Sequence, residues 1–357
     1  MCRGVELYYY EYVCFSARCI WSVARKVLLW PSVALSELSV CKRARVDSKL
    51  SLDIIIPYYN REGSLHRTLF SLEGQVNKNF RVLVVDDGSI NPLYLDGNAF
   101  SFPLSVIRQV NQGVSAARNA GAKKTSGDYL VFMDAGDEFL PGFTQKLDEM
   151  ISLSERKVLF CATSFKVIKD NKLQINHRQY SPAESENISY LKYLRRVILG
   201  EQLIHICSCC FSRKIFLSLG GFSEGATHGE DHEFILKALA MAGSLEYTPQ
   251  KLFLYCIDDN ESITRSRNST PVYAHSRYLI QKGKLSKLES EYLATTLVDN
   301  FVLNISSRKF KVALVNAFSC VRTNDFNLFV YFLLKRLVRY VSKNCQSYRY
   351  NEGGKGH

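Results

Sequence analysis

Short, continuously apolar runs that alternate with segments of helical periodicity most constrain the fold of this chain. The clearest runs lie at 52–56, 80–85 and 129–133, with a weaker one at 104–109. Between them, Leu65, Leu69 and Leu72 recur at helical spacing, and 114–124 is an alanine-rich helical segment. Strands that are apolar throughout are typical of a parallel sheet covered on both faces. We therefore predict an α/β fold with a mostly parallel central sheet flanked by helices.

Beyond residue 150 the pattern is looser. We predict strands over 158–168, 204–211 and 252–257, a helix over 228–242, and helices from about residue 275 onward. Residues 1–50 have no clear periodicity and are rich in basic and aromatic side chains, so we interpret them as an extension. The segment 266–357 is predicted to be a helical C-terminal region.

The chain has 357 residues and a formal net charge of +12, which suits nucleic acid, an anionic membrane or a phosphorylated substrate. The basic residues are spread along the sequence rather than gathered in a recognition helix. No zinc-finger or RNA-binding signature accompanies them, so we expect no nucleic-acid partner.

The 11 cysteines are an odd number without the spacing of a disulfide framework. The tightest group, Cys207, Cys209 and Cys210, lies in an apolar run, where thiols usually act as small core side chains. It contains a CxxC, but a second CxxC or a suitably spaced His pair is missing, so we expect no zinc module. This cysteine usage favours a reducing, cytoplasmic location.

The segment near 325–343 predicts a basic amphipathic helix, and the sequence contains no apolar run of about 20 residues that would cross a membrane. Lys335, Arg339 and Lys343 form a stripe beside apolar residues at helical spacing. Such a helix suits the inner face of the cell membrane, with its cations near anionic headgroups. The alternative is a terminal helix that packs on its own domain with a solvated basic face.

Two acidic clusters follow apolar strands. Asp86 and Asp87 come directly after the run at 80–85, and Asp134 and Asp137 follow the run at 129–133. Ligands of open α/β sheets bind at the carboxyl ends of strands, so these carboxylates indicate a cationic ligand or acid–base chemistry there. Taken alone, Asp-Gly is also a common turn dipeptide.

The clusters belong to a longer ordered series of motifs. The motifs are Pro57-Tyr58-Tyr59-Asn60, Val85-Asp86-Asp87-Gly88-Ser89, the segment 111–119, the segment 132–137, Gly220-Gly221-Phe222-Ser223-Glu224 and Gly229-Glu230-Asp231. The first four each lie where a predicted strand passes to a helix. The series resembles family 2 glycosyltransferases with a GT-A fold over residues 51–265. The resemblance implies a nucleotide-sugar half at 51–150 and an acceptor half at 151–265.

The resemblance also implies the donor site. The residues implied to bind the nucleotide sugar are Pro57, Tyr59, Asn60, Asp86, Asp87, Arg118, Asn119 and Asp134. The nucleoside would lie near Asp87, whose carboxylate accepts from a uracil-type imide. Arg118 would lie near phosphate or carbonyl oxygens, which a guanidinium matches in geometry. Among the nucleotide sugars, a UDP-sugar is the donor that we expect.

A divalent metal, Mn²⁺ or Mg²⁺, is implied at Asp134, where it would neutralise the leaving diphosphate. Here the chain departs from the family, whose Asp-x-Asp motif would place a second carboxylate at Gly136. Asp137 is the neighbour that could replace it. A second departure is Asp258, which stands near a position where many relatives have a metal-binding His and which offers oxygen instead.

On the acceptor side, the family pattern implies Asp231 as general base, with Glu230 as its rival, and Gly221, Phe222 and Glu224 as acceptor-side residues. Without the resemblance, acids in the first turn of a helix would simply complement its macrodipole.

The resemblance as a whole implies an inverting glycosyltransferase of surface polysaccharide synthesis. It would move a hexosyl or N-acetylhexosaminyl group from a nucleotide-diphosphate sugar to a glycan or lipid-linked acceptor. The alternative, motivated by Gly136 and by the missing metal-binding His, is a catalytically impaired membrane-peripheral scaffold of the same fold.

Overall fold

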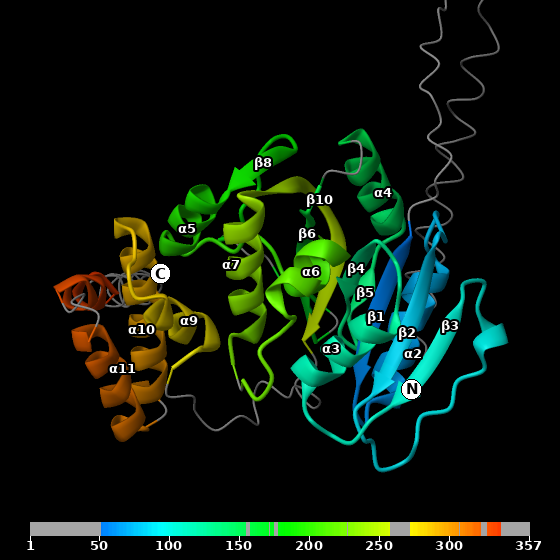
Figure 1. Cartoon of the computed structure of the whole chain (residues 1–357), viewed down its shortest axis with the longest axis horizontal. Helices are drawn as coiled ribbons and strands as arrows, with labels where there is room; N and C mark the ends of the chain where they lie inside the picture. The colour runs from blue at the N-terminus through cyan, green and yellow to red at the C-terminus, as the bar shows by residue number, and fades with distance from the viewer. Residues whose placement is uncertain are drawn as a thin grey trace, which may run out of the picture. The chain divides into compact units, whose positions relative to one another are not determined.

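The computed structural model describes residues 51–154, 158–170, 172–174, 178–226, 228–257, 272–306, 308–322 and 327–336. Its strands are β1 (Leu52–Tyr58), β2 (Phe80–Asp86), β3 (Leu104–Arg108), β4 (Tyr129–Phe132), β5 (Glu138–Phe139), β6 (Phe160–Lys169), β7 (Lys172–Gln174), β8 (Glu186–Ser189), β9 (Cys209–Ser212) and β10 (Ser244–Ile257). They form one 10-stranded sheet in the order β3-β2-β1-β4-β9-β6-β10-β5, with β7 beside β6 and β8 beside β10. Figure 1 shows this sheet running through the middle of the domain.

Helices pack on the sheet and on one another. They are α2 (Glu62–Glu73), α3 (Val114–Lys124), α4 (Phe143–Leu153), α5 (Tyr190–Ile198), α6 (Arg213–Leu219), α7 (Glu230–Ala242), α9 (Ala274–Lys282), α10 (Lys287–Ser306) and α11 (Phe310–Arg322), with 3₁₀ turns η1 (Gly97–Ala99) and η2 (Ile206–Ser208). Helix α3 packs on β1 and β2, and α4 on β6 and β10. Helices α9, α10 and α11 gather at one end of the domain in Figure 1.

The first half of the sheet confirms the prediction. Strands β1, β2, β3 and β4 are mutually parallel where they pair, and their apolar residues form the core. Ile54, Ile55 and Ile56 are fully buried, because α3 packs on β1 and β2, and α2 and α3 form where the helical periodicity predicted them. The parallel arrangement brings the carboxyl ends of β1, β2 and β4 to one edge of the sheet.

The second half of the sheet is mixed. Strand β9 is antiparallel to both β4 and β6, whereas β10 runs parallel to β6. The strand predicted over 204–211 is wrong in its first part, because η2 occupies that segment and β9 begins only at Cys209. The His205 side chain caps this turn: its Nδ1 accepts from the Cys207 amide at 3.3 Å. A local side-chain bond of this kind competes with strand pairing.

Residues 327–336 are helical and contact α10. Phe329 is buried and meets the Phe301 ring edge-on at 5.5 Å, and Arg336 forms an ion pair with Asp299. This part of the predicted amphipathic helix therefore packs on its own domain, as the second alternative requires. Within the described residues, no helix has the length and apolar character needed to cross a membrane. The predicted stripe residues Arg339 and Lys343 lie outside the described residues.

Candidate functional site

Asp86 ends β2 and is fully buried. Its Oδ1 accepts from the Ser89 amide at 2.9 Å, and its Oδ2 accepts from the Leu93 amide at 3.2 Å and from Arg108 Nη1 at 2.8 Å. Burial alone would raise the pKa of Asp86, but the bonds to Ser89, Leu93 and Arg108 outweigh it and lower the pKa. Asp86 therefore stays ionised and folds the loop that follows β2.

Asp87 is also buried, and it holds the segment that leads into α3. Its Oδ1 accepts from Gln109 Nε2 at 2.7 Å and from the Gln112 amide at 3.0 Å. Its Oδ2 accepts from the Gly113 amide at 2.8 Å, at the N-terminus of α3. These three bonds leave the carboxylate one further acceptor site, and its predicted contact with a nucleoside stays a prediction.

The turn after β1 lies beside the same loop. Asn60 has a left-handed backbone, with φ of 51°; its amide donates to Ser89 Oγ at 3.0 Å, and its Oδ1 accepts from the Ile90 amide at 2.9 Å. Pro57 pairs with Val85 across the two parallel strands, while the Tyr59 side chain is exposed. The structure thus brings the predicted nucleoside residues of β1 and β2 together at one edge of the sheet.

Arg118 on α3 joins the two halves of the site. Its Nη2 donates to Asp134 Oδ1 at 2.7 Å, and its Nη1 donates to Asp231 Oδ1 at 2.5 Å. Arg118 is 1% exposed, and its guanidinium lies over the Phe222 ring, with Cζ 5.2 Å from the ring centroid. Burial alone would raise the pKa of Asp134, but the charge and hydrogen bond of Arg118 outweigh this and hold the pKa of Asp134 below its usual range. Asp134, which follows β4, and Asp231, in the first turn of α7, are therefore fixed against one buried cation.

Asn119, the next residue of α3, binds the acceptor-side motif. Its Nδ2 donates to the Phe222 carbonyl and to Glu224 Oε1, each at 2.9 Å, and its Oδ1 accepts from the Phe222 amide at 2.8 Å. Gly221 has φ of +81°, and a Cβ there would lie 2.4 Å from Asn119 Oδ1. Only glycine permits this close approach. The structure thus places Asn119 against the predicted acceptor-side residues.

Gly136 and Asp137 follow Asp134 in a tight turn. Gly136 has φ of +111°, and its amide donates to Thr68 Oγ1 at 2.8 Å. Asp137 is 4% exposed; its Oδ1 accepts from the Cys256 amide at 2.9 Å, while its Oδ2 is buried without a hydrogen-bond partner. Burial and the neighbouring Asp134 raise the pKa of Asp137 well above its usual value. An orphaned buried carboxylate oxygen beside a second carboxylate fits a bound cation.

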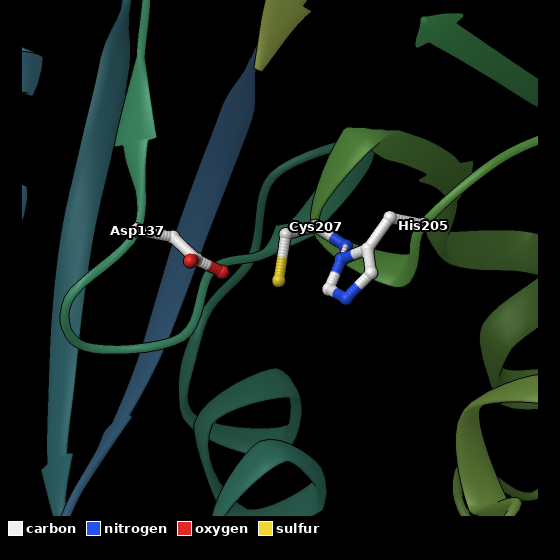
Figure 2. Close-up of side chains that lie close together, drawn as sticks. All are labelled: Asp137, His205 and Cys207. Carbon is white, nitrogen blue, oxygen red and sulfur yellow. Dashed lines mark hydrogen bonds between the residues drawn. The ribbon is translucent and has the colours of Figure 1, made fainter. Parts of the chain in front are cut away.

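Two further residues lie at this carboxylate. Ligand atoms of Asp137, His205 and Cys207 lie within 4.8 Å of one another, and Figure 2 shows the Cys207 thiol between the carboxylate and the imidazole. His205 is partly exposed, and burial lowers its pKa, although Asp134 and Asp231 nearby oppose this. The sequence reasoning missed both residues as site residues. The His-x-Cys spacing at 205–207 was the available signal, but it becomes informative only once the turn η2 brings it to Asp137.

The remaining predicted residues divide as follows. Glu230 is 7% exposed at the start of α7, next to Asp231, whose side chain is 28% exposed and ion-paired with Arg118. The structure therefore brings Asp231 into the Arg118 cluster. Asp258, predicted as a metal ligand, lies outside the described residues.

Known proteins show the same combination of sequence and fold. Residues 53–219 match the family "Glycosyl transferase family 2". An uncharacterized glycosyltransferase of Haemophilus influenzae is 26% identical over 269 residues, which cover 73% of this chain and 87% of that protein. The amylovoran biosynthesis glycosyltransferase AmsB of Erwinia amylovora is 35% identical over 113 residues, covering 30% of this chain and 36% of AmsB.

The fold has a solved counterpart. The crystal structure of S. aureus TarS residues 1–349 in complex with UDP-GlcNAc superposes with a TM-score of 0.60 at 17% identity, covering 80% of this chain and 91% of that one. This likeness concerns the fold, and it agrees with the mostly parallel sheet flanked by helices that the sequence predicted. Over residues 53–219 the chain therefore matches glycosyltransferase family 2, and its fold is the GT-A fold.

Proposed function

We propose that this glycosyltransferase inverts the anomeric centre of its donor, a nucleoside-diphosphate sugar, and transfers a hexosyl or N-acetylhexosaminyl group to a glycan or lipid-linked acceptor. The observation that carries the proposal is the pair of ion contacts from Arg118 to Asp134 and Asp231. They hold a carboxylate at a strand end of the donor half opposite a carboxylate at the start of α7. A UDP-sugar is the first donor to test, since TarS, a protein of the same fold, was crystallised with UDP-GlcNAc and with UDP.

Asp231 is the proposed general base. It accepts the proton of the acceptor hydroxyl, whose oxygen attacks the anomeric carbon while the bond to the diphosphate breaks on the opposite face. The diphosphate leaves with the bonding electrons. Arg118 acts as a positioning residue, because its buried guanidinium fixes the orientation of the base.

A divalent metal ion fits the other carboxylates. Asp134 and Asp137 would hold it, since Asp137 Oδ2 is buried without a hydrogen-bond partner and Asp134 lies beside it. A divalent ion there, Mn²⁺ or Mg²⁺ in the family pattern, would supply positive charge for the leaving diphosphate. In this proposal Asp137 takes the place of the family carboxylate that Gly136 lacks.

Release of nucleotide from a panel of nucleotide sugars with Mn²⁺ tests the enzyme. Asp231→Asn should lower transfer by about 10²–10⁴-fold while donor affinity persists, because a general base contributes this much to the rate. Glu230→Gln is the matched variant, and a larger loss there would reassign the base. If no donor is bound or hydrolysed, the impaired scaffold becomes the better interpretation.

We also propose that the protein is peripheral on the inner membrane face in the cytoplasm. Phe310, Leu314 and Phe318 are exposed along one face of α11, and Lys311 is exposed beside them. Such a face suits an anionic interface. Sedimentation with anionic liposomes tests this, and Leu314→Glu should abolish it; binding unchanged in that variant would contradict the role of α11.

A further inference from the structure

The cluster of Asp137, His205 and Cys207 offers three chemically different ligand atoms in one place. A carboxylate oxygen, an imidazole nitrogen and a thiol sulfur lie within 4.8 Å of one another. They come from separate parts of the fold: Asp137 from the turn after β4, and the other two from the N-terminus of η2 (Figure 2). The fold therefore assembles the cluster, since nothing in the local sequence forces the two segments together.

The carboxylate of Asp137 has one oxygen that is available to bind a cation. The Cys256 amide fixes Oδ1 at 2.9 Å, and Oδ2 is buried with no hydrogen-bond partner. An unsatisfied buried carboxylate oxygen costs free energy that a bound cation would recover. The hydrogen bonds of the Arg118 guanidinium go to Asp134 and Asp231 rather than to Asp137.

The other two ligands are held in place by their surroundings. The His205 ring stacks on Tyr255 at 4.6 Å and on Phe253 at 5.2 Å between centroids. Its Nδ1 accepts a hydrogen bond from the Cys207 amide, so the neutral ring carries its proton on Nε2, and a metal ion bound there would displace that proton to solvent. Cys207 is fully buried within η2. Outer contacts of this kind orient metal ligands and support affinity.

We propose that Asp137, His205 and Cys207 bind one divalent transition-metal ion, and that this glycosyltransferase therefore prefers Zn²⁺ or Co²⁺ to Mg²⁺. Thiolate and imidazole favour such ions, whereas Mg²⁺ favours an all-oxygen shell. The inference rests on the proposed function in one respect, since it names the class of metal held at Asp137. Asp134, which lies beside Asp137 and is assigned to the same ion above, would be a fourth protein ligand.

The test is titration of the full chain with Co²⁺ in the absence of any nucleotide sugar. We expect a sulfur-to-cobalt charge-transfer band in the near ultraviolet that Cys207→Ser removes and the matched variant Cys210→Ser retains, because Cys210 is buried in β9 outside the cluster. Both Cys207→Ser and His205→Gln should weaken Co²⁺ and Zn²⁺ binding by at least about tenfold. His66→Gln, on the exposed face of α2, should leave binding unchanged.

A charge-transfer band that persists in Cys207→Ser, or Mg²⁺ binding as tight as that of Co²⁺, would overturn the inference. Circular dichroism of each variant establishes that it is folded. The outcomes separate from those of the proposed function. Absence of the band in the wild-type protein, with transfer intact, overturns only the metal class, whereas a Cys207-dependent band without nucleotide binding overturns only the transferase mechanism.

Discussion

Arg118→Met isolates the charge that joins the two halves of the site, because methionine keeps most of the aliphatic stem and removes the guanidinium. In the folded protein Arg118 is 1% exposed and its single charge pairs with two carboxylates. Removing one partner of a fully buried ion pair costs about 3–5 kcal/mol, whereas an exposed pair contributes about 0–1 kcal/mol. The side chains of Asp134 and Asp231 are 39% and 28% exposed, so water would solvate both carboxylates and partly offset the loss of the Arg118 charge. We therefore expect a loss of about 2–4 kcal/mol in the free energy of unfolding.

The dependence of this loss on pH gives a sharper test. Arg118 lowers the pKa of Asp134, so ionised Asp134 stabilises the folded state above its unfolded pKa, about 3.9. That contribution disappears as the pH falls through the lowered folded value. The difference between wild type and Arg118→Met should therefore be largest at neutral pH and shrink below about pH 4.

Urea unfolding followed by circular dichroism at neutral and acidic pH measures both effects. Arg81→Met is the matched control, because Arg81 is 46% exposed and its partner Asp53 keeps an ion pair with Arg213 at 3.0 Å. The control should lose less than about 1 kcal/mol. A loss of that small size in Arg118→Met, or a loss that does not change with pH, would refute the electrostatic reasoning.

Two further predictions concern backbone strain and a buried acid. Gly136→Asp, which restores the family carboxylate, should lower the free energy of unfolding by about 1–3 kcal/mol, because φ is +111° there; a thermal melt like that of the wild type would contradict this. Glu289→Gln should cost about 2–3 kcal/mol at neutral pH, since hydrogen bonds from Lys282 and Ser286 outweigh burial and lower the pKa of Glu289 to about 2. This cost should vanish as the pH falls from about 4.3 toward that value, and a loss that persists at pH 2 in denaturant titrations would disprove the assignment.

The sequence predicted the donor half of the fold closely. Strand β2 and helix α3 lie where the apolar run and the alanine-rich segment predicted them. A strand buried on both faces requires a continuous apolar run, and a helix requires apolar residues at helical spacing, so both can be recognised in the sequence. The turn η2 was not predicted, since the hydrogen bonds at His205 compete with a strand in an apolar run. The direction of β9 depends on pairing with strands distant in sequence, and local pattern does not encode it.

The site could be predicted as a set of residues, but their contacts could not. The motifs identified Asp134, Arg118 and Asp231, yet the ion pair between the last two joins positions 113 residues apart. The sequence likewise gave no reason to place Cys207 beside Asp137. Proximity of that kind follows from the packing of η2 against the end of β4.

One turn of α3 has a consequence for the engineering of this enzyme. Arg118 and Asn119 are adjacent, yet one contacts the proposed base and the other contacts the Phe222 backbone. A chimera that takes 220–231 from a relative must therefore keep a loop whose backbone fits Asn119, or it will also misplace Asp231. New acceptor specificities should be sought in segments that do not contact α3, because exchange of the motif loop would perturb the donor half of the same site.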